Sequence, residues 1–187
     1  MAFGPSDGNL YLADVGRPFV QPGLPIRRYS GLTGAPIGTG IFASSPDLNH
    51  PTDITFGPDG SLYVANDLGN SILRFNGTTG APFPSAGNPG AFFVPPGSAG
   101  LVRPAHLVFG SDGNLLVSSP SLGAIFRYNG TTGAFINIFA SLAGVDDLLV
   151  GPDGKLYVTA TPGSTYRFNG SGFDAFIPSY SGTMVFK

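Results

Sequence analysis

What limits the possible folds of this chain above all is a motif that recurs four times along it. Its second copy occupies residues 56–65 and reads Phe-Gly-Pro-Asp-Gly-Ser-Leu-Tyr-Val-Ala, and the other copies begin at Phe3, Phe109 and Val150. A second motif, Arg followed by an aromatic residue, Asn or Ser, and Gly, comes after each copy, at Arg28, Arg74, Arg127 and Arg167. Four copies of two linked motifs indicate a repeat protein in which every copy has the same structure.

Each copy of the repeat predicts four short strands. In the first motif Pro presets the φ of one turn position and Asp-Gly then reverses the chain, which joins two strands as a hairpin. Only glycine adopts a positive φ without steric cost, so we expect it at Gly60, Gly113 and Gly154. The Leu-Tyr-Val-Ala run is typical of a strand, and Asn-Gly-Thr-Thr-Gly supplies the next turn.

The composition agrees with a fold made of strands and turns. All eleven acidic residues are Asp, whereas the chain holds 29 Gly and 18 Pro. Because helices draw on Glu, Gln and Lys while turns draw on Asp, Asn, Gly and Pro, we expect essentially no helix. Four-stranded units of about 40–50 residues that stack radially are typical of propellers. We therefore predict an all-β fold, a four-bladed β-propeller of four-stranded antiparallel blades.

The repeats predict a single propeller domain and pose a question about how it closes. Its expected units are residues 1–52, 53–105, 106–146 and 147–182, with residues 183–187 as the closing strand. The closing strand resembles the innermost strand of the third copy, whereas the innermost strand of the first copy is clipped to residues 1–3. Either the closing strand completes the ring within a monomer, or it passes to another chain in a homodimer. In the second case each chain is half of an eight-bladed ring formed by two chains, or one unit of a head-to-tail filament.

Charge and hydropathy exclude several classes of partner. A formal charge of −2 provides no basic surface for nucleic acid and no polybasic patch for lipid. No apolar run is long enough for membrane insertion, and residues 1–20 do not read as a signal peptide. The absence of cysteine excludes disulfides and thiolate metal sites. The charge-poor, Ser/Thr/Gly/Asn-rich character favours an extracellular or periplasmic setting.

The pattern Phe-Gly-Pro-Asp-Gly-x-Leu-Tyr-Val-Ala, followed by Ile-Leu-Arg-Phe-Asn-Gly-Thr-Thr-Gly, resembles the repeats of the NHL, virginiamycin B lyase-like propeller superfamily. The resemblance covers nearly the whole chain and implies the propeller fold. This superfamily includes lyases, lactonases and binding modules, and its enzymes place a metal or a catalytic group in the central funnel, where Glu and His recur. The present chain has no Glu, so a site of that kind cannot be carried over intact.

The candidate site lies where the innermost strands begin, at the mouth of the central channel. The aligned residues there are Asp53, His106, Asp147 and Thr183, with Asp146 adjacent and His50 just upstream. Asp and His are ligands suited to a divalent metal, which is the one cofactor that this set allows. The alternative is that these residues are polar because water fills the channel, in which case no cofactor binds.

Two insertions enlarge connections that emerge on the same face as the channel mouth. The apolar residues in them are Phe19 in the first copy, and Phe92, Phe93 and Val94 after the second. Because binding sites concentrate on loops carried by rigid scaffolds, these residues could form a contact patch. The alternative is that the loops fold back and cap the core of the domain itself.

The remaining repeated residues have structural explanations. We expect the four arginines to pack on an aromatic side chain of a neighbouring blade or to pair with a turn Asp. The Asn-Gly-Thr/Ser sequences match the N-glycosylation acceptor pattern, but a tight turn needs the same residues. No Ser-His-Asp triad, P-loop or metalloprotease motif occurs.

These observations favour a non-enzymatic binding or self-assembly module of the extracellular type. Its loop-bearing upper face or its chain ends would contact a protein, a glycan or a further copy of itself. The alternative is a lyase or lactonase-like enzyme with a metal at the channel mouth, held by Asp53, His106 and Asp147. The two hypotheses differ in whether the purified protein contains stoichiometric metal.

Overall fold

A computed structural model describes residues 1–14 and 24–177, and these residues form four antiparallel sheets of four strands each. The first blade contains β1 (Ala2–Phe3), β2 (Leu10–Ala13), β3 (Ile26–Tyr29) and β4 (Pro36–Ala43). The second contains β5 (Pro51–Phe56), β6 (Leu62–Asn66), β7 (Ser71–Phe75) and β8 (Phe92–Val94). The third contains β9 (Leu107–Phe109), β10 (Leu115–Ser119), β11 (Ala124–Tyr128) and β12 (Phe135–Ser141). The fourth contains β13 (Val145–Val150), β14 (Leu156–Ala160), β15 (Ser164–Phe168) and β16 (Phe173–Ile177).

Hydrogen bonding follows chain order within every sheet, so each blade is a meander of neighbouring strands. The prediction of an all-β propeller fold with four antiparallel blades of four strands each is confirmed. The described residues contain no α-helix, and the one short 3-10 turn, η1, spans Ser98–Gly100. Among these residues there is accordingly no helix with the length and apolar character needed to cross a membrane.

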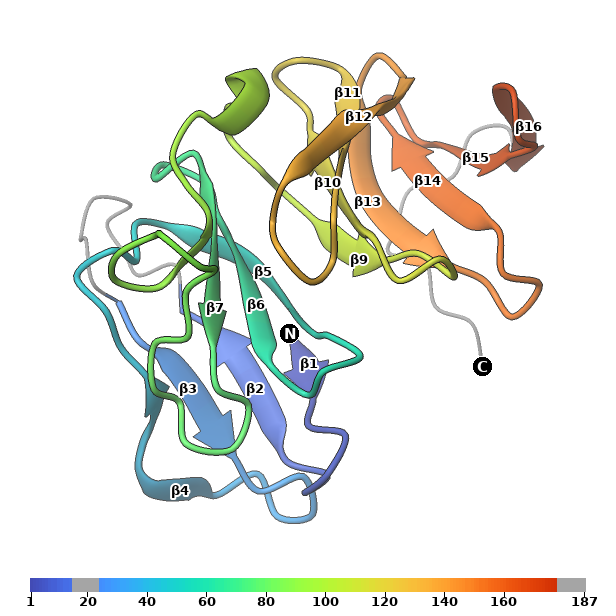
Figure 1. The fold of residues 1–187 in the computed structure, drawn as a ribbon. Helices are drawn as coiled ribbons and strands as arrows, with labels where there is room; N and C mark the ends of the chain where they lie inside the picture. The colour runs from blue at the N-terminus through green and yellow to red at the C-terminus, as the bar shows by residue number, and fades with distance from the viewer. Residues whose placement is uncertain (15–23, 178–187) are drawn as a thin grey trace.

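The four blades follow one another along an arc, with the first and fourth blades at its two ends (Figure 1). The innermost strands of successive blades touch, β1 with β5, β5 with β9, and β9 with β13. Their starting ends therefore gather on the concave side of the arc. This arrangement places the candidate channel-mouth residues of three blades close together.

The first motif forms the expected hairpin in each blade. Gly60, Gly113 and Gly154 have φ values of 74°, 74° and 73°, as predicted for the position that only glycine occupies without strain. The turn Asp stabilises the hairpin from within, because its carboxylate accepts a hydrogen bond from the backbone two residues later. In the second blade this bond joins Ser61 N to Asp59 Oδ1 at 3.0 Å.

The core is divided into three buried clusters, each between two successive blades. The first cluster joins the first and second blades around Tyr11 and Phe75, and the second joins the next pair around Tyr63 and Phe93. The third is smaller and packs Leu116 and Ile125 against β13 and β14. The described residues include no fourth cluster that joins the fourth blade to the first. Each blade is thus stabilised by its neighbours, as expected for a repeat that cannot bury both faces alone.

The insertion after the second blade supplies core, which is the alternative that the sequence left open. Phe93 and Val94 are completely buried in β8, and Phe92 is half-buried beside them. The expected contact patch is therefore corrected at these residues, because β8 completes the second blade and turns its side chains inward. Phe19 lies outside the described residues.

The first strand position of the first blade is occupied by β1. Ala2 pairs with Tyr11 and Phe3 with Leu10, so the innermost strand of the first blade is formed by residues 2–3. The predicted closing strand, residues 183–187, lies outside the described residues.

Candidate functional site

The starts of the innermost strands bring one His and three Asp side chains together. His106 lies directly before β9, between Asp53 on β5 and Asp147 on β13. Its Nδ1 is 3.7 Å from Asp53 Oδ2 and 3.4 Å from Asp147 Oδ1, and its Nε2 is 3.5 Å from Asp146 Oδ1. The structure thus brings Asp53, His106 and Asp147 together across three blades.

Backbone hydrogen bonds hold this cluster in place. The N–H of Leu107 donates to Asp53 Oδ2 at 3.2 Å, which ties the third blade to the second. The N–H of His106 donates to Ser118 Oγ at 3.1 Å, within the third blade. The cluster therefore joins the blades as well as concentrating charge.

The charges in the cluster shift two pKa values. Burial by itself lowers the pKa of His106, but its interaction with Asp53 and the charges of Asp147 and Asp146 outweigh burial, so this pKa lies above 6.5. Burial raises the pKa of Asp147, the charge of His106 opposes the rise, and the charge of Asp53 adds to it. The geometry thus favours a protonated His106 facing an excess of carboxylates.

The described residues contain no group of three or more His, Cys, Asp or Glu side chains arranged to hold a metal ion. The polar groups around His106 lie at ion-pair distances of the imidazole itself rather than around a common empty centre. Thr183, the fourth aligned residue, lies outside the described residues. Chemically, this arrangement surrounds the imidazole of His106 with carboxylates of the second and fourth blades.

His50 contacts a different set of residues, in a pocket between the second and third blades. Its Nδ1 lies 3.0 Å from Asp67 Oδ2, while Arg103 donates to the same carboxylate from Nε at 2.8 Å and Nη2 at 2.7 Å. His50, Asn70 and Arg103 have φ values of 58°, 49° and 49°, which are uncommon for residues other than glycine. Strain of this kind persists only where the surrounding contacts impose it. Sequence reasoning missed Asp67 and Arg103, because they occupy no repeated position.

A further arrangement recurs on the face that a blade turns toward the next blade. It joins a Tyr of the second strand, an Arg of the third and a Phe of the fourth, and we call it the Tyr–Arg–Phe unit. The units are Tyr11, Arg28 and Phe42; Tyr63, Arg74 and Phe93; and Tyr157, Arg167 and Phe176.

The geometry of the three units is nearly the same. The Tyr and Phe rings meet edge to face with centroids 4.7, 4.9 and 5.0 Å apart. The guanidinium carbon lies 5.4, 4.8 and 5.6 Å from the Phe centroid, within the range of a cation–π contact. These arginines thus pack on aromatic side chains of their own blade, which corrects the expectation of a neighbouring blade. The other expectation, pairing with a turn Asp, is confirmed for Arg74 with Asp59 at 3.8 Å and for Arg127 with Asp112.

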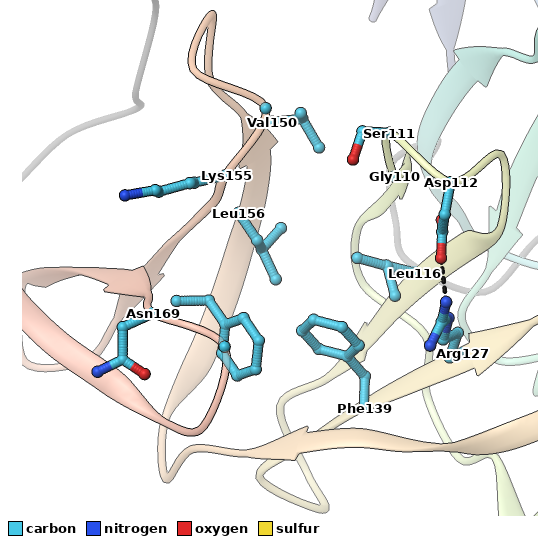
Figure 2. Close-up of a pocket in the computed structure, with 13 residues that line it drawn as sticks. Gly110, Ser111, Asp112, Leu116, Arg127, Phe139, Val150, Lys155, Leu156 and Asn169 are labelled. Atoms are coloured by element: carbon cyan, nitrogen blue, oxygen red, sulfur yellow. Dashed lines mark hydrogen bonds and ion pairs between the residues drawn. The ribbon is translucent and has the colours of Figure 1, made fainter.

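The third blade lacks this unit, and a pocket of about 340 Å³ opens between it and the fourth blade (Figure 2). Leu116 of the third blade takes the place of the Tyr of the unit. Val150 of the fourth blade takes the place of the Phe that ends the innermost strand in the other three blades, which is Phe3, Phe56 or Phe109. Apolar side chains form the interior, and the polar groups at the rim are Ser111, Asp112, Arg127, Lys155 and Asn169. Sequence reasoning missed this pocket, although the aligned repeats show both replacements.

No protein-family model matches the sequence, and no curated protein is similar to it. Solved structures, however, share its fold. Virginiamycin B lyase from Staphylococcus aureus matches with a TM-score of 0.58 and 21% identity, over 92% of this chain and 53% of that one. An auxiliary nutrient binding protein from Bacteroides ovatus matches with a TM-score of 0.66 and 15% identity, over 97% and 42%. A putative gluconolactonase matches with a TM-score of 0.56 and 19% identity, over 88% and 57%.

These similarities show that the chain has a β-propeller fold. The chain spans about half the length of the solved structures that it matches. Their identities with this chain are low, so the similarity concerns architecture and not activity.

Proposed function

We propose that this chain is a non-enzymatic β-propeller that acts as a self-assembly module, in which the fourth blade of one copy packs on the first blade of another. The observation that carries the proposal concerns the two ends of the arc. Each end presents one half of the contact that joins the first three blades to one another.

Inside the arc, a Phe of the next blade packs on the Tyr–Arg–Phe unit. Phe56 of the second blade meets the ring of Tyr11 edge to face, with centroids 5.1 Å apart. Phe109 of the third blade meets Tyr63 in the same way at 4.9 Å. Such ring pairs stabilise an interface by about 0.5–1.5 kcal/mol beyond the burial of their area.

A glycine of the next blade completes the same contact. Gly80 and Gly133 end their Thr-Thr-Gly turns, and a Cβ at either position would strike the carbonyl oxygen of Phe42 or Phe93. The turn can therefore press directly on the preceding blade. As a result Phe42 is 8% exposed and Phe93 is completely buried.

At the ends of the arc, the two halves of this contact are exposed and no described residue covers them. Phe176 of the last Tyr–Arg–Phe unit is 47% exposed. On the first blade Phe3 is 65% exposed, although it is the counterpart of Phe56 in the repeat. Gly34, the counterpart of Gly80, would carry a Cβ with no atom within 4 Å. The fourth blade thus has the receiving face, and the first blade has the residues that would cover it.

The curvature of the arc favours a second copy as the partner. The first and fourth blades lie at the two ends of the arc, and among the described residues the buried clusters join only successive blades (Figure 1). A first blade and a fourth blade at opposite ends of such an arc do not meet in one chain (Figure 1). Two copies related by a two-fold axis would form both contacts at once and close an eight-bladed ring.

The competing function is a lyase or lactonase-like reaction at the channel mouth. The lack of Glu in the chain counts against it, as does the lack of a metal-binding group of side chains among the described residues. Metal analysis of protein purified without chelator separates the two. We expect no stoichiometric divalent metal, whereas one equivalent that depends on Asp53 and His106 would favour the enzyme.

Light scattering coupled to size exclusion tests the self-assembly. We expect the wild-type chain to have twice its mass of 19.2 kDa. Phe3→Asp and Phe176→Asp should each convert it to single chains, since each variant damages both contacts of the ring. Leu122→Asp is the matched control, because Leu122 is 49% exposed in the third blade, away from either end.

Mixing the two variants makes the test specific for the direction of packing. The Phe3→Asp chain keeps an intact fourth blade and the Phe176→Asp chain keeps an intact first blade, so the mixture regains one unaltered contact. We expect heterodimers in the mixture only. Circular dichroism confirms that each variant is folded. A wild-type protein of single-chain mass at about 100 µM, or a ladder of larger species, would overturn the two-chain ring.

A further inference from the structure

We propose that the pocket between the third and fourth blades binds a para-substituted phenol, whose ring takes the place that Tyr occupies in the other blades. This site is separate from the self-association of the end blades. In the first and second blades the corresponding space is filled by the ring pairs Tyr11–Phe56 and Tyr63–Phe109. Leu116 and Val150 are both smaller than the residues that they replace, and the space between these two blades stays open.

The surroundings of the glycine that precedes each turn Asp show that the ring is missing in the third blade. A Cβ on Gly57 would lie 2.6 Å from the Tyr63 ring, and one on Gly151 would lie 2.7 Å from the Tyr157 ring. A Cβ on Gly110 would have Asp112 Oδ1 as its nearest atom at 2.9 Å, and none of its three nearest atoms, which extend to 3.8 Å, belongs to an aromatic ring. The backbone of the third blade therefore keeps the flat surface that receives an aromatic ring, without the ring.

The polar partners of the Tyr hydroxyl are retained. In the second blade the Tyr63 hydroxyl donates to Asp59 Oδ2 at 3.1 Å and accepts from Arg74 Nη1 at 3.5 Å. The third blade has Asp112 and Arg127 at the corresponding positions, and with no hydroxyl between them they pair directly through Asp112 Oδ2 and Arg127 Nη2. A phenol hydroxyl that entered this pocket would find the same acceptor and the same donor.

The positions of the acceptor, Asp112, and the donor, Arg127, are also fixed by their surroundings. Asp112 accepts from the backbone of Asn114 at 3.0 Å and from its side chain at 2.9 Å, which fixes the carboxylate. Arg127 Nε is buried without a hydrogen-bond partner among the described residues. Arg28 Nε and Arg167 Nε are buried without a partner in the same way, in blades that hold a Tyr ring, so the guanidinium of the third blade keeps the setting that it has beside a Tyr.

The rest of the pocket suits an aromatic ring. Phe139 and Phe168 line it with their ring centroids 4.6 Å apart. Leu116 of the third blade and Leu156 of the fourth blade line it from its two sides (Figure 2). Lys155 and Asn169 stand at the rim, where a para substituent would leave the pocket. The interior of the pocket thus fits the phenol ring, and the rim leaves room for its para substituent.

Titration calorimetry with p-cresol and with toluene tests the proposal, because toluene has the same ring and methyl group without the hydroxyl. We expect saturable binding of p-cresol with one site per chain, and binding of toluene weaker by about tenfold or more. Leu116→Tyr fills the space from within the protein and should abolish p-cresol binding. The same variant should raise the melting temperature by about 2 °C or more. Leu122→Tyr is the control, since it adds the same side chain on an exposed turn.

A second variant protects the test against a failure of Leu116→Tyr to fold. Val150→Phe introduces the residue that the second and third blades carry, and it should also abolish p-cresol binding. No saturable binding of p-cresol by the wild-type chain would overturn the proposal. Binding that survives in either folded variant would overturn it too, because the ligand would then lie elsewhere. Neither result bears on the mass of the assembly, so the self-association proposal is tested separately.

Discussion

The contact that joins successive blades can be measured with two glycines of the third blade. Gly113 and Gly133 have nearly the same φ, 74° and 73°, so an alanine at either position bears the same backbone strain. That strain costs about 1–2 kcal/mol. The two positions differ in their surroundings. A Cβ on Gly113 would have no atom within 4 Å, whereas one on Gly133 would strike the carbonyl oxygen of Phe93 in the second blade.

We therefore expect Gly133→Ala to destabilise the protein more than Gly113→Ala does. The overpacking that alanine introduces at Gly133 adds about 1–3 kcal/mol to the shared strain. The expected losses in the free energy of unfolding are about 1–2 kcal/mol for Gly113→Ala and about 2–5 kcal/mol for Gly133→Ala. In melting temperature, each 1 kcal/mol corresponds to about 2–4 °C for a domain of this size.

Urea unfolding followed by circular dichroism gives both free energies under identical conditions. The difference between the variants isolates the contact between blades, because the strain cancels. Equal losses would refute the reasoning, since they would mean that the second and third blades can separate slightly at no cost. A larger loss for Gly113→Ala would refute the assignment of the contact itself.

Two further predictions concern buried polar groups. The pKa of His106 is raised in the folded protein, so its protonation stabilises the fold fully below pH 6.5, and this stabilisation is lost as the pH rises through the raised pKa. His106→Asn should therefore weaken the dependence of the free energy of unfolding on pH above 6.5. His50→Asn is the control and should keep the part of this dependence that His106 contributes. Urea midpoints measured from pH 5.5 to 8.5 check this, and an unchanged pH dependence in His106→Asn would contradict it. Asn66 is completely buried and donates to Asp47 O at 3.0 Å and Ser71 Oγ at 2.8 Å, so Asn66→Ala should cost about 2–4 kcal/mol. Asn137, which is exposed on β12, is the control for thermal unfolding, and a similar small loss in both alanine variants would count against a structural role for Asn66.

The blades and their turns could be predicted from the repeated motifs. Pro-Asp-Gly turns and period-two strands act over a few residues, and the hydrogen bonds that they imply lie between neighbouring strands. For this reason the positive φ of Gly60 and the pairing within each blade follow from local chemistry. The approach of His106 to Asp53 follows as well, because residues at the same position of successive repeats occupy corresponding places in neighbouring blades.

Residues outside the repeat were harder to place. Nothing in the sequence marks Asp67 and Arg103 as partners of His50, since the three come from connections whose paths depend on packing. Phe93 and Val94 looked like loop residues until β8 paired with β7 and turned them into core. Burial of this kind depends on which segments meet across blades, and periodicity carries no information about that.

The sequence by itself determined four copies of one blade, the hairpins that build them and the order of their strands, because each of these depends on contacts between near neighbours in the chain. The tertiary structure alone decided how the blades curve, and with it the exposure of Phe3 and Phe176 at the ends of the arc. It also decided what the replacements at Leu116 and Val150 do. A small residue in an aligned motif becomes a pocket only when the opposite blade brings a second small residue to face it, and the stacking of side chains between blades controls that meeting.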